Sequence, residues 1–124
     1  VHAVDVGHDQ LAARLAADPR VIRHDGLDAR RLTRDLLGAD PQAIVADVSF
    51  ISVTKALPAA LAIAAPGCWL VALIKPQFEV GAAGIGKGGI VRDAGLRRSA
   101  VDSVLAWFGT RNGWRIVGTM PVAP

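Results

Sequence analysis

Residues 43–48 (Ala-Ile-Val-Ala-Asp-Val) and residues 69–75 (Trp-Leu-Val-Ala-Leu-Ile-Lys) decide the fold class of this 124-residue chain. Each is an apolar run with one charge near its end, Asp47 in the first and Lys75 in the second. Continuous apolar runs of this length are typical of strands that are buried on both faces of a parallel sheet. We therefore predict strands over residues 43–48 and 69–74.

The rest of the chain alternates between helical and extended segments. The apolar spacing predicts helices over residues 9–17, 29–37, 52–65 and 93–110. Further strands are expected over residues 2–6, 21–22 and 115–120. Gly38 ends the second helix, Asp93 caps the last one, and the glycines of residues 81–89 form a loop. Strands that alternate with helices predict an α/β fold with a parallel sheet covered on both faces.

The composition fits one globular domain. Hydrophobic residues make up 52% and charged residues 20% of the chain, which favours a packed core and excludes a disordered protein. The formal net charge of +3 suits contact with a polyanion, although many domains that bind no nucleic acid are as basic. The single cysteine, Cys68, excludes an internal disulfide and a cysteine-based zinc site. The three histidines are scattered along the sequence, so we predict no metal site.

Residues 56–74 carry no charge, which raises the question of a membrane span. Pro58 interrupts this stretch, and the pair Pro66 and Gly67 marks a turn within it. We therefore expect a buried helix followed by a buried strand. No basic and then apolar leader opens the chain, so a cytoplasmic protein without a membrane partner is expected.

Three charged residues directly follow apolar strand residues: Asp5, Asp47 and Lys75. In open α/β sheets, ligands bind just outside the carboxyl ends of the strands. A charge at such a place is costly unless it is paired, solvated in a cleft or used in chemistry. One acid there would be unremarkable, but three charges predict a shared site at one edge of the sheet.

The residues alone leave several roles open. Asp5 could accept both hydroxyls of a nucleoside ribose, or it could cap the following helix. Asp28 could accept from an adenine amino group, or it could cap the arginine-rich helix. Pro76 favours an extended conformation for Lys75, so the lysine is fixed at the sheet edge. There it could act in catalysis, form a structural ion pair with Asp47, or do both.

The glycine-rich stretch of residues 84–89 does not match a phosphate-binding loop, because its glycine spacing is wrong and no Ser or Thr follows the lysine. It could still be a mobile loop that presents Lys87 and Arg92 to phosphates, or an ordinary flexible loop. Ser49 and Ser52 have no histidine nearby in the sequence, which argues against a serine hydrolase.

Four blocks of sequence carry a family resemblance: residues 3–12, 47–52, 74–79 and 86–93. In this order they resemble the TlyA-like (haemolysin A) family of ribosomal RNA methyltransferases over essentially the whole chain. The resemblance implies a Rossmann-like fold of the FtsJ type and S-adenosylmethionine as the methyl donor. It also implies 2′-O-methylation of cytidine in ribosomal RNA, with that RNA or ribosomal subunits as partners.

The family uses a Lys-Asp-Lys-Glu tetrad, and the resemblance places its Asp at Asp47 and its second Lys at Lys75. The first Lys and the Glu fall outside this chain, and Glu79 belongs to another block and does not replace the missing Glu. The cofactor is expected to contact four residues: Asp5, Val6, Asp28 and Asp47. The RNA substrate is expected to contact two residues: Lys87 and Arg92.

The resemblance makes residues 1–124 part of a methyltransferase domain. The first strand with its glycine-rich turn, the last strand and an amino-terminal S4 domain are then missing from the chain, so the chain alone is expected to be inactive. Two alternatives remain at this point. One is a non-catalytic RNA-binding or ribosome-associated module with the same fold, and the other is an NAD-dependent oxidoreductase that binds the adenosine ribose through Asp5.

Overall fold

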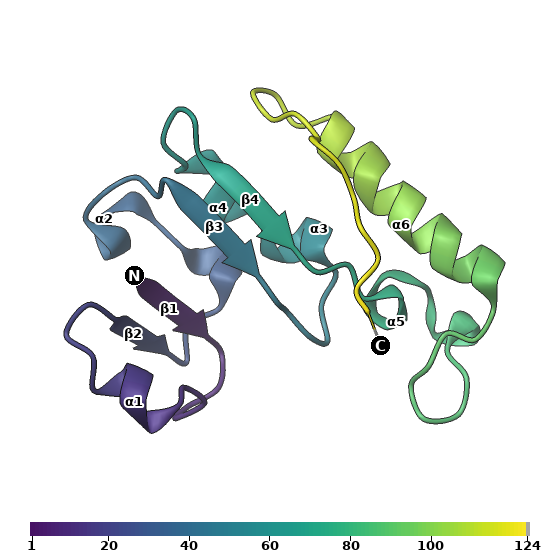
Figure 1. Ribbon diagram of the computed structural model, residues 1–124, viewed down its shortest axis with the longest axis horizontal. Helices are drawn as coiled ribbons and strands as arrows, with labels where there is room; N and C mark the ends of the chain where they lie inside the picture. Colours follow the sequence, from purple (N-terminus) through teal and green to yellow (C-terminus); the bar gives the residue numbers. More distant parts are fainter. Residues whose placement is uncertain (124) are drawn as a thin grey trace. The chain divides into compact units, whose positions relative to one another are not determined.

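The computed structural model describes residues 1–123. Its strands pair in parallel, as expected for an α/β fold (Figure 1). Strand β1 (His2–Asp5) pairs with β2 (Ile22–Asp25), and β3 (Ala43–Ala46) pairs with β4 (Trp69–Ala72). The expected single sheet is instead two sheets of two strands each. Each strand has four residues, so β3 and β4 end two residues earlier than predicted.

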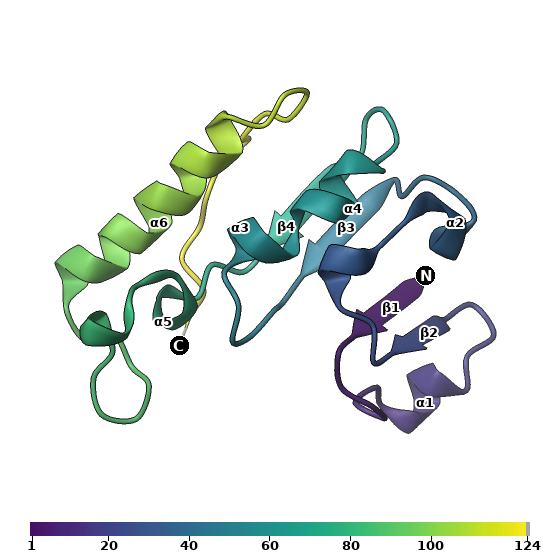
Figure 2. The same cartoon turned by 180° about the vertical axis from the view of Figure 1, so that it is seen from behind.

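The predicted strand over residues 115–120 is wrong, because no strand is formed there in the described part of the chain. A strand exists only where a neighbour completes its ladder of hydrogen bonds. The expectation that helices cover both faces of the sheet is also incomplete for β3 and β4. Helix α4 (Pro58–Ala62) lies on one face of this pair (Figures 1 and 2), while alternate strand residues such as Val45 and Val71 stay exposed.

The helices in the first part of the chain are shorter than the predicted ranges. Helix α1 (Ala13–Ala16) begins later than predicted, because Asp9 has a positive φ of 54° and Ala12 has a non-helical ψ of 139°. Residues 29–37 form two pieces, the 3₁₀ turn η1 (Ala29–Arg31) and helix α2 (Arg34–Leu37). Gly38 ends α2 in the left-handed conformation at φ 71°, as predicted.

The predicted helix over residues 52–65 is broken into α3 (Val53–Ala56) and α4. Pro58 starts α4 and has no N–H to continue the hydrogen bonds of α3, which explains the break. Two short turns within the second half of the chain were not predicted: α5 (Pro76–Glu79) and η2 (Ala82–Gly84).

Helix α6 (Ala94–Gly109) is the longest element and agrees with its prediction. Asp93 caps it, since its Oδ1 accepts a hydrogen bond of 2.9 Å from the Leu96 N–H. Ala100 and Val104 are buried on one face of this helix. No helix in residues 1–123 has the length and apolar character that crossing a membrane would require.

The chain divides into two compact units, which we describe separately. The first comprises residues 1–48 and 55–72 and contains both sheets, with η1 packed against α4. The second comprises residues 49–54 and 73–123, with α5 packed against α6. The buried apolar residues of the first unit come mainly from the region around α4: Ala46, Ala56, Leu57, Ala60 and Leu61. Those of the second unit are Val53, Val91, Ala100 and Val104.

Candidate active site

The carboxyl ends of β1 and β2 place two carboxylates side by side in the first unit. Asp5 ends β1 and stands in register with Asp25, the last residue of β2. The Asp5 side chain is exposed, and its Oδ1 accepts a hydrogen bond of 2.8 Å from the Gly7 N–H. Asp5 therefore shapes the turn after β1 rather than capping α1, and it remains accessible from solvent.

Asp25 was missed by the sequence analysis, because the predicted second strand ended at Ile22. It forms an ion pair with Arg23, whose guanidinium also reaches Asp9 Oδ1 at 2.9 Å. The hydrogen bond from Arg23 holds the pKa of the Asp25 carboxyl below its usual value, followed by the one from the Asp9 N–H. The signal that could have identified it is the polar pair His24 and Asp25 directly before Gly26.

Asp28 caps the 3₁₀ turn η1. Its Oδ1 accepts a hydrogen bond of 2.9 Å from the Arg30 N–H, and its Oδ2 lies 2.5 Å from the Arg30 Nη2. The side-chain hydrogen bond from Arg30 is the main cause that lowers the pKa of Asp28 to about 2. Of the two roles considered from the sequence, the capping role is the one that the structure displays directly.

Asp47 and Lys75 follow the two strands of the second sheet. Asp47 is the first residue after β3 and is exposed, and Lys75 comes three residues after the end of β4. The ends of β3 and β4 are in register, with Ala46 opposite Ala72. Lys75 is extended, with φ −107° and ψ 103°, as predicted from Pro76.

The second unit holds residues 49–53 against residues 75–79 at three points. The Lys75 Nζ donates a hydrogen bond of 3.0 Å to the Ser49 Oγ. The Phe50 and Phe78 rings lie 5.1 Å apart between their centroids. The Glu79 carboxylate accepts from two donors, the Ser52 hydroxyl at 2.6 Å and the Val53 N–H at 2.9 Å. We call this arrangement the 49–53/75–79 clasp.

Phe50 has the most unusual environment in the clasp. Its φ is 63°, a left-handed conformation that costs a bulky residue free energy, and its side chain is 91% exposed. Together with Gln77, Phe78 and Ile85 it lines an open hollow of about 640 Å³. An exposed aromatic ring on a strained backbone is a feature of functional sites, and sequence reasoning did not identify Phe50.

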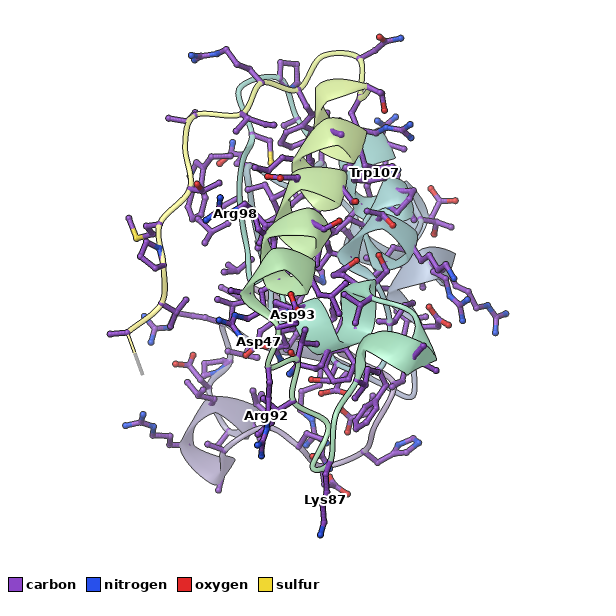
Figure 3. All side chains as sticks on the ribbon, turned by 90° about the vertical axis from the view of Figure 1, so that its right-hand side faces the viewer. Asp47, Lys87, Arg92, Asp93, Arg98 and Trp107 are labelled. Carbon is purple, nitrogen blue, oxygen red and sulfur yellow. The ribbon has the colours of Figure 1, made fainter. Side chains whose placement is uncertain are left out.

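The glycine-rich loop forms one side of this hollow through Gly88 and Gly89, which both have positive φ. The loop closes on itself, because the Gly86 N–H donates to the Ile90 carbonyl at 3.0 Å. Lys87 lies at the tip of the loop, and both Lys87 and Arg92 extend away from α6 (Figure 3).

Arg97 on α6 fixes the base of the loop. Its Nη1 donates to the carbonyls of Val91 at 2.9 Å and of Arg92 at 2.6 Å. Among residues 1–123, no three His, Cys, Asp or Glu side chains are grouped so that they could hold a metal ion.

Known proteins match this chain over most or all of its length. A family model described as FtsJ-like methyltransferase matches residues 1–123. The 16S/23S rRNA (cytidine-2′-O)-methyltransferase TlyA of Mycobacterium tuberculosis is 44% identical over 95% of the chain, and Hemolysin A of Brachyspira hyodysenteriae is 38% identical over 86% of it. The chain spans only 44% and 45% of the lengths of these two relatives.

A solved structure has the same fold. This structure belongs to a Streptococcus thermophilus protein that is named as a hemolysin. It superposes on this chain with a TM-score of 0.79, and the two sequences are 39% identical. The superposition covers 86% of this chain and 38% of that one.

Proposed function

Because this chain belongs to the FtsJ-like methyltransferase family, we propose that the whole protein transfers a methyl group to ribose 2′-hydroxyls of ribosomal RNA. The 44% identity to an enzyme named for cytidine 2′-O-methylation supports cytidine as the target nucleoside. Ribosomal RNA or ribosomal subunits are then its partners, and the cytoplasm is its compartment. The observation that carries the proposal is the match of the FtsJ-like methyltransferase model to residues 1–123.

S-adenosylmethionine is the general methyl donor of FtsJ-like methyltransferases, and the residues present here fit part of it. Asp5 offers an accessible carboxylate for two ribose hydroxyls, and the neighbouring Val6 is 66% exposed and offers an apolar contact. We assign Asp28 to the adenine end and Asp47 to the end nearer the reaction. The bound cofactor would supply an electrophilic methyl group on a positively charged sulfur.

Lys75 is the residue we assign to the ribose hydroxyl. Methyl transfer requires the hydroxyl oxygen to be in line with the methyl group and to lose its proton. A neutral Lys75 amine would accept that proton, whereas a charged ammonium would stabilise the developing negative charge on the oxygen. The hydrogen bond to Ser49 fixes the direction of the Lys75 side chain in either case.

We assign the RNA contacts to the second unit. The exposed Phe50 ring, backed by Phe78, offers a flat surface on which a nucleobase can stack. Lys87 and Arg92 are exposed on the loop beside the same hollow and would contact phosphates.

The chain would be the central part of the methyltransferase domain. We propose that the rest of the whole protein supplies the first strand with its glycine-rich turn, the last strand, an S4 domain, and the remaining Lys and Glu of the tetrad. The two separate sheets support this, because their outer strands have unpaired edges that can accept further strands. Assays of activity therefore require the whole protein, and the isolated chain is expected to be inactive.

Two measurements on the whole protein test the proposal. Calorimetric titration should show binding of S-adenosylmethionine and no binding of NAD. Incubation of ribosomal RNA with cofactor labelled in its methyl group should place the label on ribose 2′-oxygens. Binding of NAD alone would indicate an oxidoreductase, and RNA binding without cofactor binding would indicate a non-catalytic module, so either result contradicts the proposal.

A further inference from the structure

We propose that Glu79 is a positioning residue for the methyl transfer, an inference that rests on the proposed function. Glu79 holds residues 49–53 in the clasp and thereby sets where Phe50 and Lys75 lie. Its carboxylate accepts hydrogen bonds from Ser52 and Val53, so its effect is transmitted through the 49–53 segment.

The hydrogen bonds of Glu79 account for its hold on this segment. One carboxylate oxygen accepts from the Ser52 hydroxyl and the other from the Val53 N–H. Hydrogen bonds to an ionised acceptor are roughly twice as strong as neutral ones. Val53 is only 1% exposed, so its N–H would have little access to water if the carboxylate were removed.

The strained backbone at Phe50 gives this hold a consequence for the site. A bulky residue stays at positive φ only where the surrounding structure enforces it. Lys75 contacts the segment at Ser49, before the strained residue, and Glu79 contacts it at Ser52 and Val53, after that residue. Releasing the second contact lets Phe50 relax and moves the Ser49 hydroxyl that orients Lys75.

The geometry gives Glu79 a structural role in the clasp. Both of its carboxylate oxygens already accept hydrogen bonds from the protein, and the residue is partly buried. Its role is therefore to hold Ser52 and Val53, and a neutral side chain of the same shape can keep both contacts through weaker hydrogen bonds. A glutamine has a carbonyl oxygen for the Val53 N–H and an amide nitrogen that can donate to the Ser52 Oγ.

Steady-state kinetics of the whole protein test this with four variants. Glu79→Ala should lower kcat roughly tenfold to a hundredfold, because small misplacements of reacting groups have effects of this size. Its affinity for S-adenosylmethionine should stay within about threefold of the parent, since the clasp contains none of the residues assigned to the cofactor.

Glu79→Gln should restore most of the lost kcat. Ser52→Ala removes one of the two donors and should give a smaller loss. Asp102→Ala removes an exposed carboxylate from α6 and is the matched control.

Amide hydrogen exchange of the parent and the variants, without RNA or cofactor, is a second measurement that does not depend on activity. The Val53 N–H should exchange faster in Glu79→Ala and at nearly the parental rate in Glu79→Gln. Unchanged Val53 exchange in Glu79→Ala would overturn the inference. So would parental kcat in a variant whose Val53 exchange is faster, or a Glu79→Gln variant as slow as Glu79→Ala. If Glu79→Ala does not fold, the kcat and the Val53 exchange rate of Ser52→Ala test the inference in its place. An inactive parent would instead contradict the proposed function.

Discussion

Replacing Phe50 by glycine separates the contribution of this residue to stability from its contribution to RNA binding. Glycine adopts positive φ freely, so Phe50→Gly relieves a strain of about 1–2 kcal/mol. The ring is 91% exposed, so its loss uncovers only roughly 20 Å² of apolar surface, worth about 0.5 kcal/mol. Losing the contact with Phe78 costs about 0.5–1.5 kcal/mol, and the greater freedom of unfolded glycine costs about 0.5–1 kcal/mol.

The costs exceed the relieved strain by no more than about 2 kcal/mol, so the unfolding free energy of Phe50→Gly should fall by less than about 2 kcal/mol. Truncating a buried phenylalanine costs about 3–5 kcal/mol. Stacking of a base on an aromatic side chain is worth about 1–3 kcal/mol, so RNA affinity should fall roughly 5-fold to 150-fold. Chemical denaturation and fluorescence anisotropy with a ribosomal RNA fragment measure the two quantities in the whole protein.

Phe50→Leu is the control for this experiment. Leucine keeps the strain and much of the apolar side chain but has no aromatic face, so RNA affinity should fall as in Phe50→Gly while no strain is relieved. Parental RNA affinity in both variants would refute the stacking role. A loss of more than about 3 kcal/mol of stability in Phe50→Gly would show instead that the ring belongs to the core.

Three other perturbations have expected outcomes. Asp5→Ala should weaken S-adenosylmethionine binding by about 1–3 kcal/mol, up to roughly a hundredfold in a calorimetric titration of the whole protein, because two ribose hydroxyls lose their acceptor; unchanged affinity would leave Asp5 only its bond to Gly7. Asp93→Ala should lower the unfolding free energy by about 1 kcal/mol in chemical denaturation, because the Leu96 N–H loses its cap; an unchanged midpoint would show that the cap contributes nothing. Stability should also fall as the pH drops below the ordinary histidine pKa of 6.5, because burial and then the nearby His24 lower the pKa of His2, so the unfolded chain takes up the proton first. His2→Gln should reduce this dependence in thermal unfolding measured at pH 5 and pH 7.5, and an equal dependence in both proteins would assign it to other groups.

Local rules of sequence predicted those features that depend on one residue and its neighbours. Asp93 and Gly38 cap the ends of helices where expected, and Pro76 keeps Lys75 extended. Pro58 was recognised as an interruption of the charge-free stretch, yet its effect on the predicted helix was underestimated. The parallel α/β class followed from the alternation of apolar strands and helices, and the family match agrees with it.

Features that depend on contacts between distant segments could not be predicted. Glu79 meets Ser52 and Val53 across 27 and 26 positions of sequence, and no spacing rule pairs a carboxylate with a hydroxyl at that separation. The positive φ of Phe50 is likewise imposed by its surroundings, since phenylalanine itself disfavours it. The strand expected over residues 115–120 failed for a related reason, because its formation depends on a partner strand that its own sequence does not reveal.

Methylation of ribosomal RNA by the Lys75→Ala variant of the whole protein tests the central assignment most directly. The rate of 2′-O-methylation should fall roughly 10²–10⁴-fold, whether Lys75 accepts the proton or stabilises the oxyanion. S-adenosylmethionine affinity and the thermal midpoint, measured on the same sample, should stay close to those of the parent. A folded Lys75→Ala protein that methylates at nearly the parental rate would contradict the assignment of Lys75 to the reaction.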